Sequence, residues 1–415
     1  MIHLFDVALI VLSLLGTASI LLWFAVLFHS ARPWDLQPIG EELAPPSAPL
    51  AWPAVAILVP ARNEAAALPR TLPALLGQEY PGAFQVLLID DRSTDGTADA
   101  ARKIGVECGA QERLTVIEGL PLPAGWAGKV WALEQGANTE NSKLKIQDSR
   151  FLLLTDADIL HARGSLRRLV AESCADALAL NSRMARLRCV SPAEKLLIPP
   201  FVFFFNLLYP LRRVNDPGDP LAAAAGGCVL LSREALEEAG GFASIQGALI
   251  DDLNLARKIK RPGRAIRLAL SREDVVSLRS YATLGAIWAM VRRTAFTELG
   301  HSWLRLAGAL AALAMAFVVP PFLLVAGGVL SLLAWVEALP LPLVWTVMLA
   351  CKGILAWALL AHLFRPAVTF FQLRAGWRWT LPLAGLLYGG MTLDSACQHL
   401  GGKGSGWRDR GEATL

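Results

Sequence analysis

An uncharged apolar run near the start of the chain, residues 7–28, constrains the fold more than any other feature of the sequence. At 1.5 Å per residue, a helix of this length can cross the hydrocarbon core of a bilayer. A cleaved signal peptide is the alternative, but no basic segment precedes the run, and the run exceeds the roughly 7–15 apolar residues of such signals. We therefore expect a membrane anchor at residues 1–30.

Two further apolar runs, residues 306–336 and 341–364, predict membrane segments near the other end of the chain. The loop that follows, residues 365–379, has three arginines and no acidic residue, which places it in the cytosol by the positive-inside rule. A last apolar stretch, residues 381–400, contains Asp394, and the sequence leaves open whether this stretch crosses the membrane.

The composition fits a soluble middle between membrane ends. Hydrophobic residues make up 54% and charged residues 18%, which is high for a soluble protein and low for one embedded throughout. The net charge of +4 is spread along the chain, so we expect no nucleic-acid partner. The six cysteines form no C-x-x-C pair and no Cys/His group, which argues against a zinc site and suits a reducing compartment.

Short apolar runs of strand length alternate with helical stretches from residue 54 onward. The runs are residues 55–59, 86–89, 114–117 and 151–154, each followed by a polar turn. This alternation predicts an α/β fold with a mostly parallel central sheet. Ligands of such sheets bind at the carboxyl ends of the strands, so the residues directly after each run are the candidates for function.

A very apolar, aromatic stretch flanked by Lys and Arg lies at residues 191–213. Its central Pro199-Pro200 pair favours a segment lying on the membrane surface over one that spans it, and a buried core helix remains open. The predicted order is a membrane anchor (1–30), a Pro-rich linker (31–53), the α/β domain (54–300, including 191–213), C-terminal membrane segments (301–400) and a basic tail (401–415).

Polar residues follow the first two predicted strands. Asn63 and Glu64 come after the first, and Asp90 and Asp91 end the second. Such side chains can bond the base edge and ribose hydroxyls of a nucleotide at a strand-end crevice. Asp95, by contrast, is interpreted as a residue that caps the following helix.

The most specific feature is the pair Asp156 and Asp158, directly after the fourth predicted strand. Two carboxylates one residue apart predict a Mg²⁺ or Mn²⁺ that bridges phosphate oxygens. His161 is interpreted as a supporting residue and not as a metal ligand. Lys129, behind Gly128 at a predicted helix start, suits a diphosphate, although a solvated lysine is equally compatible.

Two later features predict the acceptor side of the same site. Gly226 and Gly227 precede a short apolar strand, which allows a ligand or only a tight bend. Asp251 and Asp252 begin a predicted helix, where an acid favours the helix dipole or serves as the base for a hydroxyl.

In this order the residues resemble family 2 glycosyltransferases of the GT-A fold, from about residue 55 to 293. Within that family the chain is most similar to the membrane-bound branch that contains ceramide glucosyltransferases and the hopene-associated glycosyltransferases of hopanoid biosynthesis. The stretch Leu154–His161 and the flanking membrane segments carry the closer likeness.

The resemblance implies roles for individual residues. Asp156 and Asp158 would hold the metal and the donor diphosphate, and Asp252 would be the catalytic base of an inverting transfer, with Asp251 where relatives usually have Glu. The residues implied to contact the nucleotide are Pro60, Ala61, Asn63, Glu64, Asp90 and Asp91.

A departure from the family lies after the base. Many relatives have Gln-x-x-Arg-Trp, but residues 289–294 contain neither the Gln nor the Trp, and Arg292 or Arg293 is expected to reach a phosphate. The transfer of one sugar is therefore favoured over a processive polysaccharide synthase. A catalytically inactive lipid-binding relative is the other alternative, although both the acid pair and the base are present.

The resemblance also implies partners and location. The expected donor is a nucleotide sugar, with a UDP-sugar favoured, and the acceptor is a lipid, with hopanoids as one class. The expected location is the bacterial inner membrane, crossed several times, with the catalytic domain in the cytosol.

Overall fold

The computed structural model describes residues 2–43, 47–139, 149–261 and 263–400. They form two compact units. The α/β unit contains residues 37–188 and 211–280, and the helical unit contains residues 2–36, 189–210 and 281–400. This division differs from the predicted domain of residues 54–300, because part of the linker joins the α/β unit and residues 281–300 join the helical unit. The predicted basic tail lies outside the described residues.

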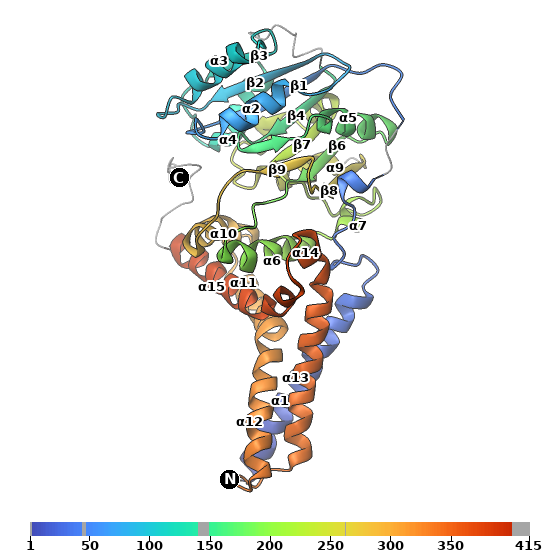
Figure 1. Cartoon of the computed structure of the whole chain (residues 1–415), viewed down its shortest axis with the longest axis vertical. Helices are drawn as coiled ribbons and strands as arrows, with labels where there is room; N and C mark the ends of the chain where they lie inside the picture. Colours follow the sequence, from blue (N-terminus) through green and yellow to red (C-terminus); the bar gives the residue numbers. More distant parts are fainter. Residues whose placement is uncertain (1, 44–46, 140–148, 262, 401–415) are drawn as a thin grey trace. The chain divides into compact units, whose positions relative to one another are not determined.

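Within the described chain, the α/β unit has a seven-stranded sheet with the order β3-β2-β1-β4-β7-β6-β8 (Figure 1). Strand β7 is antiparallel to β4 and β6, and the other neighbouring pairs are parallel, which confirms the predicted α/β fold. The first four strands and β7, the short strand after Gly227, were predicted from sequence, whereas β6 and β8 were not. Their bounds are β1 Val55–Ala61, β2 Phe84–Asp90, β3 Leu114–Glu118, β4 Phe151–Thr155, β6 Leu180–Met184, β7 Cys228–Ser232 and β8 Ile266–Leu270.

The central strands are buried on both faces because helices cover the sheet. Every residue of β1 is buried, as its nearly continuous apolar sequence predicts. Its alternate residues Val55, Ile57 and Val59 share a core cluster with Leu72 and Leu75 of α2. Main helices of this unit are α2 Leu68–Leu76, α3 Thr97–Glu107, α4 Gly128–Ala137, α5 Ser165–Ala175 and α9 Asp251–Lys260, and a small antiparallel sheet pairs β5 Ile159–His161 with β9 Val275–Ser277.

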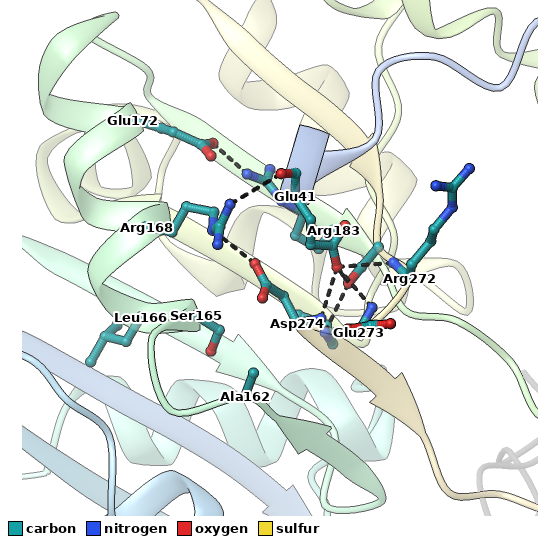
Figure 2. Close-up of polar contacts among 12 residues, drawn as sticks. Glu41, Ala162, Ser165, Leu166, Arg168, Glu172, Arg183, Arg272, Glu273 and Asp274 are labelled. Atoms are coloured by element: carbon teal, nitrogen blue, oxygen red, sulfur yellow. Dashed lines mark hydrogen bonds and ion pairs between the residues drawn. The ribbon is translucent and has the colours of Figure 1, made fainter. Parts of the chain in front are cut away.

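The end of the linker is tied to the edge of the sheet. Ile39 forms a parallel bridge with Leu270 of β8, and the next residues form the short helix η1 (Gly40–Glu42). Oε1 of Glu41 accepts hydrogen bonds from Ser271 Oγ at 2.6 Å and from the backbone N–H of residues 272–274 at 2.8–2.9 Å (Figure 2). Burial alone raises the pKa of Glu41, but these bonds outweigh it and lower the pKa below its ordinary value.

A buried ion pair lies beside this contact. Arg183 on β6 is almost fully buried and pairs with Glu172 of α5 (Figure 2). It also donates to Asn181 Oδ1 at 2.7 Å. A side chain at Gly40 would collide with the Arg183 guanidinium, which explains a glycine at this point of the linker.

The helical unit has, among the described residues, three stretches long and apolar enough to cross a membrane: Asp6–Phe28, Trp303–Trp335 and Leu343–Leu363. They lie in α1 (Ile2–Phe28), in α11 to α12, and in α13, and α1, α12 and α13 run alongside one another (Figure 1). The apolar stretch at residues 381–400 forms helix α15 but does not meet the same criterion. Remaining helices of this unit are α6 Pro192–Leu208, α10 Leu284–Glu298, α11 Trp303–Leu313, η4 Ala314–Val318, α12 Val319–Trp335, α13 Leu343–Leu363, α14 Arg365–Phe370, η5 Ala375–Thr380 and α15 Leu381–Leu400.

Close contacts hold these helices together. Gly327 of α12 lies against the backbone of Ala350, so any side chain there would force the helices apart, as at small-residue contacts of membrane helices. Lys352 in the middle of α13 donates to Ser13 Oγ at 2.6 Å and Thr17 Oγ1 at 2.9 Å on α1. These bonds satisfy an ammonium group in an otherwise apolar span.

The aromatic segment predicted at residues 191–213 is mainly helix α6, which begins with a capping box between Ser191 and Glu194. Phe203 packs against Phe364 with ring centroids 5.4 Å apart, and Tyr388 donates to Leu197 O at 2.8 Å. One face of α6 is thus buried inside the helical unit, while contact of this segment with a membrane surface stays a prediction.

We predict that Glu41→Gln loosens the linker, because the amide lacks the charge that strengthens four hydrogen bonds. A loss of about 1–3 kcal/mol of local stability is expected, seen as faster hydrogen–deuterium exchange at residues 272–274. In the native protein, protection should persist at pH 5 and disappear as the pH falls through the lowered pKa of Glu41. The control is Glu42→Gln, which removes a partly exposed pair with Arg272 and alters an exposed contact with Gln37, and equal effects of the two variants would contradict the assignment.

Candidate active site

The candidate site is built at the carboxyl ends of β1, β2 and β4. These strands are neighbours and run parallel, so their ends meet at one edge of the sheet. Asp90 is the last residue of β2, Asn63 and Glu64 follow β1, and Asp156 follows β4. The register pairs Ala61 with Asp90, which brings these polar ends together as the sequence predicted.

Two loops interlock at the ends of β1 and β2. The N–H of Asn63 donates to Ser93 Oγ at 2.9 Å, and Asn63 Oδ1 accepts from the N–H of Thr94 at 2.9 Å. Asn63 adopts φ 54°, a left-handed conformation that asparagine tolerates. Asp95 accepts from the N–H of Thr97, the first residue of α3, at 3.1 Å, so it supports the helix start from the position before the N-cap residue Gly96.

Asp90 and Asp91 have different surroundings. Oδ1 of Asp90 is buried and has no hydrogen-bond partner among the described residues, as expected of an atom that awaits a ligand. Asp91 is 3.5 Å from Arg62 Nη1, and the same arginine donates to Asp91 O at 2.9 Å. The sequence reasoning missed this neutralising arginine. Pro60 and Ala61 are buried within β1. Only the backbone at the end of this strand therefore lies near the loop that follows it.

Lys129, the second residue of α4, lies among acidic side chains. Its Nζ is 2.8 Å from Asp156 Oδ1 and 3.4 Å from Asp251 Oδ2, and it donates to Gly226 O at 3.4 Å. Burial alone lowers its pKa, but these carboxylates raise the pKa of Lys129 above its ordinary value. Lys129 is therefore charged at any working pH and joins the end of β4 to the start of α9.

Asp252 occupies the next position of α9. Its Oδ2 accepts from the N–H of Gly226 at 2.7 Å, and its Oδ1 accepts from the N–H of Leu253 at 2.8 Å. Burial and the neighbouring Asp251 carboxylate raise the pKa of Asp252 to about 7, against the opposing charge of Lys129. The pKa of Asp252 thus lies above the ordinary aspartate value of about 3.9, because the site is desolvated and carries a second acid.

Asp158 and Glu64 share one guanidinium. Arg279, two residues beyond β9, donates from Nε to Asp158 Oδ2 at 2.6 Å and from Nη2 to Glu64 Oε1 at 3.2 Å. The side chains of Asp158 and Glu64 are 9% and 12% exposed, against 38% for Asp156. Sequence reasoning missed Arg279, since nothing marks it among the 39 Lys and Arg residues.

Each of the two predicted metal ligands thus has its own cationic partner. Asp156 pairs with Lys129, and Asp158 pairs with Arg279. The described residues contain no cluster of three or more His, Cys, Asp or Glu side chains arranged to hold a metal. Two carboxylates nevertheless suit Mg²⁺ or Mn²⁺, which usually take one or two protein carboxylates and complete their shell with substrate phosphates and water. The two carboxylates therefore fit a Mg²⁺ or Mn²⁺ ion that binds together with a diphosphate.

His161 links the end of β4 to the loop before β7. Its Nε2 lies 2.8 Å from Thr155 Oγ1, and Thr155 Oγ1 donates to Gly227 O at 2.9 Å. Nδ1 of the same ring lies 3.2 Å from Ser165 Oγ, so the imidazole bridges two hydroxyl groups. Burial lowers the pKa of His161 to about 4, so it is a neutral supporting residue, as the sequence predicted.

The remaining predicted residues divide between the two units. Gly226 and Gly227 lie directly before β7 and contact Asp252 and Thr155 as described above. Arg292 and Arg293 lie in α10 of the helical unit, where Arg292 is 3.4 Å from Asp394. Their proposed contact with a phosphate stays a prediction.

Comparisons with known proteins agree with this geometry. Residues 56–240 match the family model Glycosyl transferase family 2. Over 270 residues the chain is 29% identical to putative cellulose synthases 2 and 3 of Komagataeibacter xylinus, a match that spans 62% of this chain and 16% of each relative. The mannosyltransferase PcManGT from Pyrobaculum calidifontis, solved with GDP-Man and Mn²⁺, has a TM-score of 0.53 and 22% identity, covering 84% of this chain and 98% of that one. The likeness to this solved structure shows that the chain has the GT-A fold, and residues 56–240 match the family 2 glycosyltransferase model.

We predict that Gly226→Ala impairs turnover without unfolding the protein. An added Cβ would lie 3.1 Å from Lys129 Nζ and 3.2 Å from Asp252 Oδ2, so both side chains must shift. Small displacements of reacting groups can cost about 100-fold in rate. Gly164→Ala is the control, because its Cβ would meet open space. Unchanged kcat for Gly226→Ala would contradict the close packing of this site.

Proposed function

We propose that this chain, whose residues 56–240 match the family 2 glycosyltransferase model, transfers one sugar from a nucleotide-diphosphate sugar to a lipid at a membrane. The observation that carries the proposal is the ionic bridge of Lys129, which joins Asp156 at the end of β4 to Asp251 beside Asp252. This bridge brings the proposed donor site at the end of β4 and the candidate base Asp252 into one cluster.

The donor's nucleoside is proposed to bind over the ends of β1 and β2. The unbonded Oδ1 of Asp90 supports a hydroxyl or amino contact there, with Asp91, Asn63 and Glu64 around it. Pro60 and Ala61 would contribute backbone only. The diphosphate would lie by Asp156 and Lys129, and a UDP-sugar is the proposed donor, although the similar mannosyltransferase was solved with GDP-Man.

Asp156 and Asp158 are the proposed ligands of Mg²⁺ or Mn²⁺. When bound, the metal supplies positive charge to the diphosphate leaving group. The solved mannosyltransferase contains Mn²⁺, which supports this choice.

Asp252 is the proposed base of an inverting displacement. It removes the proton of the acceptor hydroxyl as that oxygen bonds to the anomeric carbon, while the bond from this carbon to the diphosphate oxygen breaks and its electron pair leaves with the nucleoside diphosphate. A pKa of about 7 suits the task, because a general base works best when its pKa lies near the operating pH. Gly226 and Gly227 would line the acceptor side.

A lipid acceptor is supported by the three helical stretches that are able to cross a membrane. We propose a multi-pass protein of the bacterial inner membrane with the catalytic domain in the cytosol, where nucleotide sugars are made, and hopanoids as one acceptor class. The relatives named putative cellulose synthases keep a processive alternative in view. The missing Gln-x-x-Arg-Trp motif favours one transfer per acceptor.

A direct test uses the full-length protein in membranes, labelled UDP-sugars and GDP-sugars, and total membrane lipids. We expect a lipid product that carries one sugar, because a single metal-assisted transfer completes the reaction. EDTA should abolish its formation, and Mg²⁺ or Mn²⁺ should restore it. A long polymer would favour the processive alternative, and full activity in chelator would contradict the metal role.

The base is tested by pH and substitution. Because only ionised Asp252 accepts a proton, kcat/KM should rise with pH through about 7. Asp252→Asn should lower turnover by at least ~100-fold and leave nucleotide binding intact. Asp251→Asn should cost less and move the acidic limb to lower pH, because it removes the charge that raises the pKa of Asp252. If Asp252→Asn stayed active while Asp251→Asn did not, the two roles would be reversed.

A further inference from the structure

Arg279 bonds a carboxylate that is one of the two proposed metal ligands. Its guanidinium bonds Asp158, one of the two proposed metal ligands, and Glu64 at the end of the neighbouring strand β1. The side chains of both acids are nearly buried, and the side chain of Arg279 is 35% exposed. The guanidinium of Arg279 therefore already neutralises Asp158, the more buried member of the pair Asp156 and Asp158.

The backbone holds Arg279 at this place. Strand β9 pairs with β5, which begins one residue after Asp158, and the N–H of Leu278 donates to Asp158 O at 2.9 Å. The side chain of Arg279 can turn, but its starting point is fixed beside Asp158. A movement of the guanidinium away from the carboxylate therefore requires no change in the sheet.

A guanidinium and a divalent ion compete for the same carboxylate. Arginine keeps its charge at every working pH, so it cannot make room by losing a proton. A metal at Asp158 would be repelled by the guanidinium unless further negative charge arrives. A donor diphosphate brings that charge, together with oxygens that suit the planar fork of an arginine.

We propose that Arg279 is a positioning residue that occupies Asp158 until the donor binds, then releases it to the metal and bonds the donor diphosphate. This inference rests on the proposed function. It predicts that the protein binds metal weakly by itself and tightly together with a nucleoside diphosphate. Metal and nucleotide would thus bind with positive coupling, and Arg279 is the residue that creates it.

The experiment measures Mn²⁺ binding to the full-length protein in detergent by the loss of the free-ion paramagnetic resonance signal, with and without UDP, and with GDP in parallel. For Arg279→Gln we expect Mn²⁺ alone to bind at least ~10-fold more tightly, since even at the dielectric constant of water a nearby unit charge repels a divalent ion by this much. Binding of UDP in the presence of Mn²⁺ should weaken, so the coupling falls toward one. Arg279→Lys keeps the charge and should leave the affinity for Mn²⁺ alone close to that of the native protein.

The matched control is Arg188→Gln, a nearby arginine of the same unit that donates to Ser280 Oγ at 3.0 Å. It should change neither affinity. A merely structural role for Arg279 would weaken Mn²⁺ and UDP binding together, and that result, or an unchanged affinity for Mn²⁺ alone, would overturn the inference while leaving the proposed function intact. If the native protein bound no Mn²⁺ even with UDP or GDP, both would fail.

Discussion

The ion pairs of Lys129 are the contacts on which the rest of the candidate site depends. They hold Asp156 and Asp251, which come from β4 and α9, against one ammonium group. The position of that group is set by α4, which lies close to the sheet because Gly136 has no side chain to collide with Ile89. Without this ammonium group, the carboxylates of Asp156 and Asp251 would repel each other. Burying them beside the carboxylate of Asp252 would then be still less favourable.

A second cation, Arg279, makes a similar pair of contacts at the same edge of the sheet. Arg279 holds Asp158 and Glu64 as Lys129 holds Asp156 and Asp251. Each carboxylate therefore has an ionic partner from a different part of the chain before any ligand binds. This explains how four acidic side chains can share a partly buried region, and why no three of the described acids converge as a ready-made metal cage.

The sequence predicted the parts of this site that depend on local pattern. Apolar runs located β1 to β4, and the polar residues after them, such as Asp90 and Asp156, lie at the expected edge. Partners set by tertiary packing could not be found in this way. Arg279 is 121 positions from Asp158 in the chain, and Glu41 meets Ser271 across 230 positions. The pKa of Asp252 likewise depends on burial and on a neighbour's charge, neither of which a residue type reveals.

The reversed direction of β7 has a consequence for the surface around the site. Thr155 pairs with Cys228, the first residue of β7, whereas Ser232, the last, pairs with Phe151 at the far end of β4. The segment that enters β7 thus reaches the reactive edge of the sheet, and the segment that leaves it, beginning with α8 (Arg233–Glu238), starts from the opposite edge. Changes within α8 therefore lie away from the candidate site, whereas changes in the stretch that ends at Gly227 act at the edge of the sheet where Thr155 and Asp156 lie.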